Sequence, residues 1–558
     1  MADAEKSTST GPGDEVDQID APASAARRCL SISELLEQIS EALCGTRTRP
    51  ELRDVTSLAL TCKAYHEPAQ NIFWRDQQDL LPLVKCFPVD SWEIITGNFE
   101  FKRALLLEDW ARFMVNAARV KSFHHDGLGT TPGIDHSVLS MLATYRPSLV
   151  LFPNLRKFRW ENFGYHFDSS PLVTVFFSPS LTSITLYRND FSNALMDSSI
   201  LRILKQNCPN LTDLSLGGDT WSEDIMGLGP AVAELILSLS HLRTLYSSPA
   251  LTGAAVVHLA TLPSLQSITF TARLDRVSAT GLRAEHRLFP SVKTLEIHLD
   301  ELDRWSEVLL TSNTSSSLKS LKVTADSDPQ RDILLVHVQG WAQYANTLRS
   351  LDLAFPESRE SPPQMPEWQR LEYTINGPVI AALYPLRKLE HLSIYCYHLD
   401  LTDEDLWDLS EAFPNLNALR LHSNYSCGRV PRVTAQGVVH LTTRCPSLEC
   451  LGIALNATNL QWSLPAGTPP HMHITKLLIS DSPIDNPAAV ALFLSALIAG
   501  PTASIELIKT IVDDEHKEQH DRYENTWREV NSAFKMMQLA REQERARDSC
   551  GITFPTTI

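Results

Sequence analysis

The stretch CPNLTDLSL, residues 208–216, decides the fold because it recurs along the chain. Close copies are FPNLNALRL (413–421), CPSLECLGI (445–453), LPSLQSITF (262–270) and FPSVKTLEI (289–297). Each copy places apolar residues at the first, fourth and sixth positions of an L-x-x-L-x-L core. The alternation in the second half of the core is the period of a half-buried strand, so each copy predicts a β-strand.

Looser copies extend the pattern to twelve cores, spaced 23 to 41 residues apart. The segment ARVKSFHH (118–125) is a degenerate thirteenth copy. The first positions of the twelve cores are Leu155, Leu181, Leu211, Leu242, Leu265, Val292, Leu318, Leu348, Leu389, Leu416, Leu448 and Ile474.

Helical segments separate the cores, as in LTDEDLWDLSEAF (401–413) and VTAQGVVHLTTRC (433–445). Thr402, followed three residues later by an acid, is a helix-start signal. One strand and one helix cannot bury their apolar faces alone, so neighbouring repeats must stack. The sequence therefore predicts an α/β solenoid over residues 118–500, with a parallel sheet inside and helices outside. In this respect the chain resembles leucine-rich repeat proteins.

Composition limits the classes of function. A chain of 558 residues is too long for one ordinary core, which favours several domains or a repeat array. The net charge of −17 argues against a general nucleic-acid or anionic-membrane binder. The acidic start lacks the features of a signal peptide, and the longest apolar stretch, residues 488–500, is too short to span a bilayer. We expect a cytoplasmic or nuclear protein with reduced thiols.

Before the repeats, the sequence predicts three short helices. CLSISELLEQISEALCG (29–45) carries apolar residues at helical spacing, and Pro50 opens a second helix that reaches Cys62. Pro68 is expected to end that helix and to start a third one containing Trp74. Because a unit of three short helices cannot form a large core, we expect it to expose an apolar face that binds a partner.

This region resembles an F-box, through its opening leucine, its I/L-L-x-x-I helix, the L-x-L-T-C-K segment and the final aromatic–tryptophan pair. The span from Leu30 to Pro88 is similar to F-box proteins of basidiomycete fungi that carry leucine-rich repeats. The resemblance implies docking on the Skp-type adaptor of a cullin–RING ubiquitin ligase, with the repeats binding an unknown target protein. Ser31 stands where the family usually has proline. The adaptor-binding residues implied are Leu30, Ile32, Leu35, Leu36, Ile39, Leu58, Cys62 and Trp74.

A second interpretation is that the three helices only cap the open end of a repeat scaffold. Under either interpretation the expected domains are the same. They are a disordered acidic tail (1–25), an F-box or cap (26–90), a helical linker (91–117), the repeat solenoid (118–500) and a C-terminal capping helix with a tail (501–558).

A binding surface is expected on the C-terminal half of the repeats. Three long segments follow strand cores and contribute the aromatic residues Trp368, Tyr425 and Trp462 to one rim. The concave face of the sheet would add Tyr395, Arg420 and His422, which alternate with core residues. We expect this rim and face to bind a protein rather than nucleic acid or membrane.

Catalytic and metal chemistry have no support in the sequence. His124, His125 and Asp126 are adjacent and would point in different directions, and Cys396 with His398 offers too few ligands for a metal. No phosphate-binding loop, dinucleotide-binding motif or nucleophile elbow occurs. The expectation is a binding protein without catalytic residues, metal or cofactor.

Overall fold

The computed structural model describes residues 32–43, 49–61, 63–125, 133–134, 136–162, 170–188, 194–217, 228–272, 288–311, 317–355, 371–423, 425–426, 430–460, 470–500, 502–508, 510–512 and 516–549. The chain divides into two compact units. Unit 1 comprises Met1–His125 and Gly129–Arg156, and unit 2 comprises Asp126–Leu128 and Lys157–Ile558.

Unit 2 is built on a parallel sheet whose strands follow one another in chain order. In the described residues these strands are β6 (Lys157–Asn162), β7 (Ser183–Arg188), β8 (Asp213–Gly217), β9 (Thr244–Leu251), β10 (Ser267–Ala272), β11 (Thr294–Leu299), β12 (Ser320–Ala325), β13 (Ser350–Ala354), β15 (His391–Cys396), β17 (Ala418–Ser423), β19 (Cys450–Ile453), β20 (Lys476–Ile479) and β21 (Ser504–Leu507). Shorter pairs outside this sheet are β14 (Thr374–Asn376) with β16 (His398–Asp400), and β18 (Tyr425–Ser426) with β22 (Ile511–Val512).

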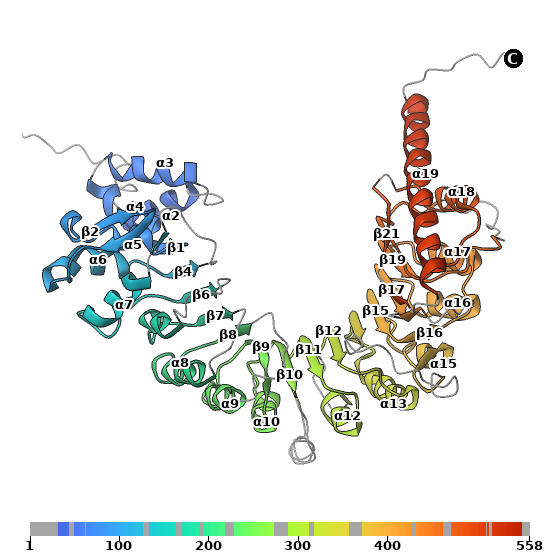
Figure 1. Cartoon of the computed structure of the whole chain (residues 1–558), viewed down its shortest axis with the longest axis horizontal. Helices are drawn as coiled ribbons and strands as arrows, with labels where there is room; N and C mark the ends of the chain where they lie inside the picture. The colour runs from blue at the N-terminus through green and yellow to red at the C-terminus, as the bar shows by residue number, and fades with distance from the viewer. Residues whose placement is uncertain are drawn as a thin grey trace, which may run out of the picture. The chain divides into compact units, whose positions relative to one another are not determined.

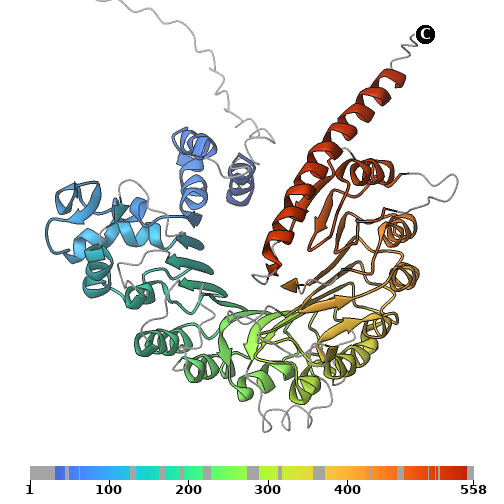
Figure 2. The same ribbon diagram turned by 45° about the vertical axis from the view of Figure 1, so that its right-hand side comes forward.

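Helices cover one face of this sheet, and the strands themselves form the opposite surface of unit 2 (Figures 1 and 2). The α-helices are α8 (Ala194–Asn207), α9 (Gly229–Leu237), α10 (Gly253–Thr261), α12 (Arg304–Thr311), α13 (Arg331–Trp341), α15 (Gly377–Ala381), α16 (Asp403–Ala412), α17 (Ala435–Arg444), α18 (Pro487–Leu497) and α19 (Lys517–Ser549), and the 3-10 helices are η3 (Ser170–Phe176) and η4 (Ala342–Tyr344). The predicted α/β class is therefore confirmed, and the arrangement of unit 2 is solenoid-like.

The repeat pattern explains where each strand begins. All twelve predicted cores form strands, and each strand starts two residues after the first position of its core, as β8 does after Leu211. The first-position residues are all buried, as expected for aliphatic side chains of a repeat core. Backbone hydrogen bonds between second-position residues link neighbouring repeats. Arg243 N–H donates to the Thr212 carbonyl at 2.7 Å, and Gln266 N–H donates to the Arg243 carbonyl at 2.8 Å.

The sheet extends beyond the predicted end of the solenoid at residue 500. Strand β21 pairs with β20 in the register of the other repeats, with Lys476 aligned to Ser504. The sequence pattern missed this strand because Thr502 occupies the first position, where the other cores have an aliphatic residue. Helix α19 packs on α18 and β21, and it buries Trp527, Val530 and Phe534.

Unit 1 contains the three predicted N-terminal helices, at slightly different bounds. Its elements are α2 (Ser33–Leu43), α3 (Arg49–Ala59), α4 (Lys63–Arg75), β1 (Asp76–Gln77), α5 (Leu81–Val84), η1 (Val89–Ser91), β2 (Trp92–Ile95), β3 (Asn98–Phe101), η2 (Leu107–Asp109), α6 (Trp110–Ala117), β4 (Ser122–His125), β5 (Gly133–Ile134) and α7 (His136–Tyr145). Strand β4 is the degenerate thirteenth copy, and it pairs in parallel with β1.

Two predictions for unit 1 are wrong. Pro68 lies inside α4 instead of separating two helices. The helix begins at Lys63, so the chain passes through Pro68 without a break, and its ring is buried. The expected helical linker over residues 91–117 is interrupted, because residues 92–101 form the antiparallel hairpin β2–β3 and helical structure resumes only at Leu107. Alternating apolar and polar residues and a left-handed turn at Thr96 and Gly97 favour the hairpin there.

Candidate interaction surfaces

Helix α2 exposes an apolar stripe. Ile32, just before its first turn, and Ile39 are 45% and 38% exposed, and Leu35 between them is half-buried. These three positions fall on one side of a helix, because residues three, four and seven apart lie close in angle. Leu36 borders the stripe and is buried. Three of the predicted adaptor-binding side chains therefore remain at the surface of unit 1.

The other predicted adaptor-binding residues differ in position. Trp74 is only 8% exposed, and its indole N–H donates to Gln70 Oε1 at 2.8 Å. It is a core residue of unit 1, packed edge-on against Phe73. Leu58 is half-buried, whereas Leu30 and Cys62 lie outside the described residues.

Polar contacts hold α2 against α4. Asn71 Nδ2 donates to Glu37 Oε1 at 3.3 Å, and Arg75 forms an ion pair with Glu41. Arg119, after α6, donates to Asn71 Oδ1 at 3.1 Å and to Glu67 of α4 at 2.5 Å. These contacts fix the orientation of the apolar stripe relative to the rest of unit 1.

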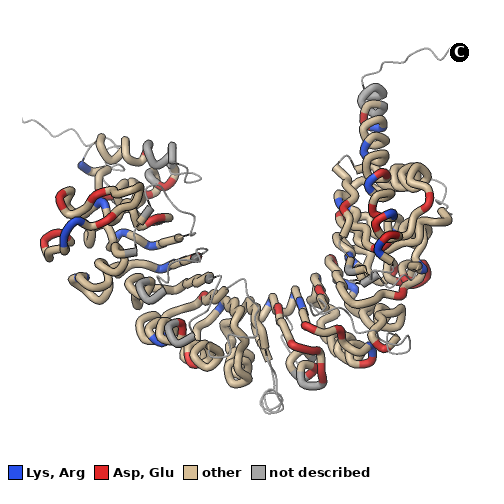
Figure 3. The backbone as a smooth tube through the Cα atoms, in the orientation of Figure 1, with Lys and Arg blue, Asp and Glu red and all other residues tan. Residues whose placement is uncertain are grey.

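The strand face opposite the helices of unit 2 carries a row of mixed polar residues. Strand register aligns one residue from each neighbouring strand, in the order Tyr246, Thr269, Glu296, Lys322, Asp352, Ser393 and Arg420. Lys322 Nζ lies 2.5 Å from Glu296 Oε1, and the Thr269 hydroxyl donates to Glu296 Oε2 at 3.3 Å. Charges of opposite sign thus alternate along the row. Figure 3 colours the acidic and basic positions along the backbone, and both signs occur along unit 2.

Burial shifts the protonation equilibria of this row. Burial raises the pKa of the Asp352 carboxyl, and the positive charge of Lys322 opposes that shift. For Lys322, burial lowers the pKa, but the hydrogen bond and charge of Glu296 outweigh it, so the pKa is raised. The row neutralises most of its own charge, which makes it unsuited to tracking a line of phosphates.

The structure brings together three of the predicted target-binding residues. Tyr395 of β15 is aligned with His422 of β17, and Arg420 lies two residues before His422 on the same strand. Arg420 is exposed and Tyr395 is half-buried. His422 is only 5% exposed, and burial, together with the charge of Arg420, lowers its pKa to about 4. His422 is therefore a neutral packing residue, and Arg420 is the accessible charge.

A small pocket of about 50 Å³ lies at the edge of the sheet where β15, β17, β19 and β20 end. Its walls are mainly aliphatic, and Arg432 at its rim donates to Asp400 Oδ1 at 2.7 Å. The pocket is on the rim where aromatic residues were predicted. Of these, Tyr425 is described only in its backbone, which forms β18 and pairs with β22. Trp368 and Trp462 lie outside the described residues.

No cluster of three or more His, Cys, Asp or Glu side chains that could hold a metal occurs in the part of the chain that the structure describes. Cys396 is fully buried, and burial raises its pKa well above the usual value for a thiol, so it is a poor nucleophile. Among the described residues, no helix combines the length and apolar character needed to cross a membrane.

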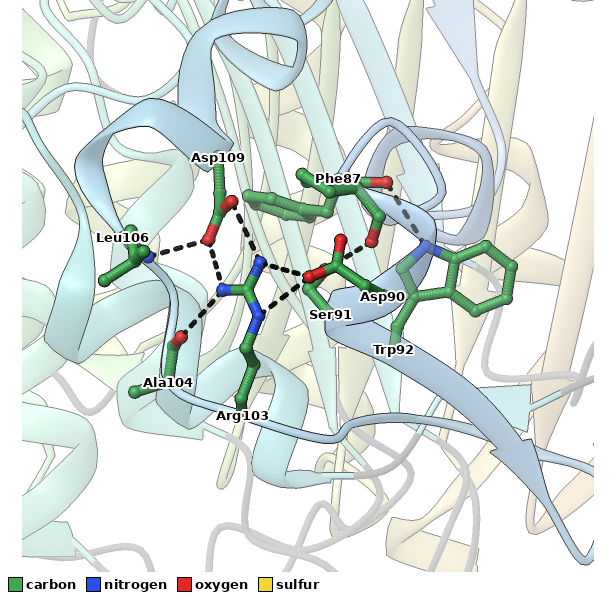
Figure 4. Close-up of polar contacts among 9 residues, drawn as sticks. Phe87, Asp90, Ser91, Trp92, Arg103, Ala104, Leu106 and Asp109 are labelled. Atoms are coloured by element: carbon green, nitrogen blue, oxygen red, sulfur yellow. Dashed lines mark hydrogen bonds and ion pairs between the residues drawn. The ribbon is translucent and has the colours of Figure 1, made fainter.

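One polar centre, in the hairpin region of unit 1, was not predicted from the sequence (Figure 4). The Arg103 guanidinium donates to Asp109 Oδ2 at 2.6 Å and to Asp90 Oδ2 at 2.9 Å. Asp109 Oδ2 also accepts the Leu106 N–H at 2.8 Å. The hydrogen bonds from Arg103 and Leu106 to Asp109 hold the pKa of Asp109 below its usual value. The turn residue Gly97 between two alternating segments was the signal that could have revealed the hairpin.

Neither a scan against protein-family models nor a search of curated proteins finds a match to this chain.

Proposed function

We propose that this chain is an F-box protein with leucine-rich repeats, which acts as the substrate-recognition subunit of a cullin–RING ubiquitin ligase in the cytoplasm or nucleus. The apolar stripe of Ile32, Leu35 and Ile39 is the main support, because apolar side chains that lie together at the surface on one helix face are typical of an interaction site. The stripe would dock on a Skp-type adaptor, and through it on a cullin.

Unit 2 would bind the target protein. The strand face around Arg420 and the rim pocket beside Arg432 offer polar and aliphatic contacts of the kind that protein interfaces use. The chain would contribute no catalytic group. It would raise the effective concentration of the target's lysines near a ubiquitin-loaded enzyme.

A repeat scaffold whose N-terminal helices serve only as a cap is the second candidate. Two observations favour it: Trp74 is buried, and α4 runs directly into β1, which pairs with β4. In that function unit 1 would need no adaptor.

Adaptor binding distinguishes the two candidates. The experiment is a pull-down of the full chain with a fungal Skp-type adaptor, using the wild type and an Ile32→Asp, Ile39→Asp double variant. Both side chains are exposed, so the variant should fold, which circular dichroism checks. Gln38→Asp, at another exposed position of α2, is the matched control.

We expect the wild type and the Gln38→Asp variant to bind, and the double variant to lose binding. A folded wild-type chain that does not bind the adaptor would leave the capped scaffold as the function.

A further inference from the structure

The hairpin β2–β3 ends a small sheet in unit 1. Strand β3 pairs with β2 on one side and with β5 on the other, so β2 is an edge strand in the described residues. The turn between the strands has positive φ at Thr96 (49°) and Gly97 (87°), as a tight two-residue hairpin turn requires.

The hydrogen-bond pattern shows which backbone groups of β2 point outward. Lys102 N–H donates to the Ser91 carbonyl at 2.9 Å, so residues 91 and 102 form a hydrogen-bonded pair. Such pairs alternate along an antiparallel ladder, which leaves Trp92 and Ile94 in non-hydrogen-bonded positions. Their N–H and C=O groups point away from β3, and no described residue pairs with them.

The two faces of the hairpin differ in chemistry. On one face Glu93 lies directly opposite Glu100, and Lys102 Nζ lies 3.4 Å from Glu93 Oε2. Ile95, two residues further along β2 on this face, is 43% exposed. On the other face Trp92 stacks on the buried Phe99, and Ile94 beside them is 49% exposed. A strand added to β2 would place its residues alternately next to Glu93 and next to Ile94. Basic residues suit the first position, and apolar residues suit the second.

The edge is held rigid before any partner binds. Arg103, just after β3, bonds to Asp90 before β2 and to Asp109 of η2 (Figure 4). The Trp92 indole N–H donates to the Phe87 carbonyl at 3.2 Å. A preformed edge loses little conformational entropy on binding, which favours strand addition.

A second copy of this chain fits the edge poorly. In the antiparallel register that uses the outward groups of both Trp92 and Ile94, Glu93 would face Glu93 of the second copy. Like charges directly opposite each other destabilise a strand pair.

We propose that the free edge of β2 binds an extended segment of a partner protein by strand addition, and that this segment alternates basic and apolar residues. This site is separate from the stripe on α2 and does not depend on adaptor binding.

The test uses the full chain and two synthetic blocked hexapeptides, one alternating lysine and valine and the other alternating glutamate and valine. We expect the lysine peptide to bind at least about tenfold more tightly than the glutamate peptide, because of the charges of Glu93 and Glu100. Glu93→Lys should reduce or reverse this preference. Equal affinity of the two peptides, or binding of neither, would overturn the proposal.

Two substitutions of Ile94 test the backbone hydrogen bonds of the proposed strand addition. Ile94→Pro removes an outward N–H that makes no ladder bond, whereas Ile94→Ala removes the side chain but keeps the N–H. We expect Ile94→Pro to weaken binding of the lysine peptide about tenfold relative to Ile94→Ala. Amide hydrogen exchange of the wild type is the independent readout. The peptide should protect the amides of Trp92 and Ile94, and unchanged exchange at both would overturn the proposal.

Discussion

At the scale of single residues, glycine positions shape the strand face of unit 2. A Cβ at Gly217 would lie 2.5 Å from Cδ2 of Tyr187, on the preceding strand of the sheet. A Cβ at Gly452 would lie 2.5 Å from Nε2 of His422. Both rings cross the backbone of the next strand, and only a residue without a side chain leaves room for them.

We predict that Gly452→Ala destabilises unit 2 by about 1–3 kcal/mol, because the added methyl group forces the buried His422 ring out of its position. Urea unfolding measures the change. The same substitution in a His422→Ala background is the control, because the ring that clashes is then absent. A similar cost in both backgrounds would show that the clash is not the cause.

At the scale of elements, neighbouring helices of unit 2 cap one another. Thr402 and Asp405 form the predicted capping box of α16, with Thr402 N–H donating to Asp405 Oδ2 at 2.8 Å. Asp403 of α16 also reaches the start of α17. Its Oδ1 accepts the Thr434 N–H at 2.8 Å and the Gly437 N–H at 3.1 Å. One carboxylate thus satisfies donors at the N-terminus of the next repeat's helix.

Asp403→Ala should therefore cost about 1–2 kcal/mol of unfolding free energy, as expected for loss of a helix cap. The measurement is chemical unfolding followed by circular dichroism. Glu404→Ala, at the exposed neighbouring position, should change stability by no more than about 0.5 kcal/mol. Equal effects of the two substitutions would contradict a capping role for Asp403.

Most elements of unit 2 could be predicted because their apolar residues repeat with a fixed spacing, and twelve copies reinforce one another. The hairpin β2–β3 could not, since its strands are four residues each and occur once. The orientation of side chains at the candidate sites also needed the structure. The resemblance to F-box proteins implied that both Trp74 and Ile39 contact an adaptor, but only the structure shows that the first is buried and the second exposed.

At the scale of the whole molecule, the last repeat of an array has no neighbour to cover its apolar surface, so a capping element must cover it. Helix α19 covers the last strand of unit 2, and Trp527 Nε1 donates to the Ser482 carbonyl at 2.8 Å. His520 of the same helix lies between two carboxylates, with Nδ1 3.2 Å from Asp481 Oδ1 and Nε2 3.5 Å from Glu524 Oε1. The hydrogen bond to Asp481 is the main reason that the pKa of His520 is raised.

Attachment of α19 should therefore depend on pH. Because the pKa of His520 is higher in the folded chain than in the unfolded chain, protonation of His520 stabilises the fold. The full contribution is present at pH values below the pKa of the unfolded chain, about 6.5. This contribution is lost as the pH rises through the folded pKa. We expect the stability difference between wild type and His520→Gln to shrink over that interval, as measured by urea unfolding at several pH values. A difference that is constant or grows with pH would contradict this.

The repeat also supplies a pair of matched chemical reporters. Cys208 and Cys445 occupy equivalent positions in two distant repeats, both fully buried, and burial raises the pKa of each thiol to about 12. Because their surroundings are alike, their alkylation rates under native conditions should differ mainly by how often each region opens. Alkylation rates measured separately for the two cysteines would thus compare local opening at two points along the sheet, without any introduced probe.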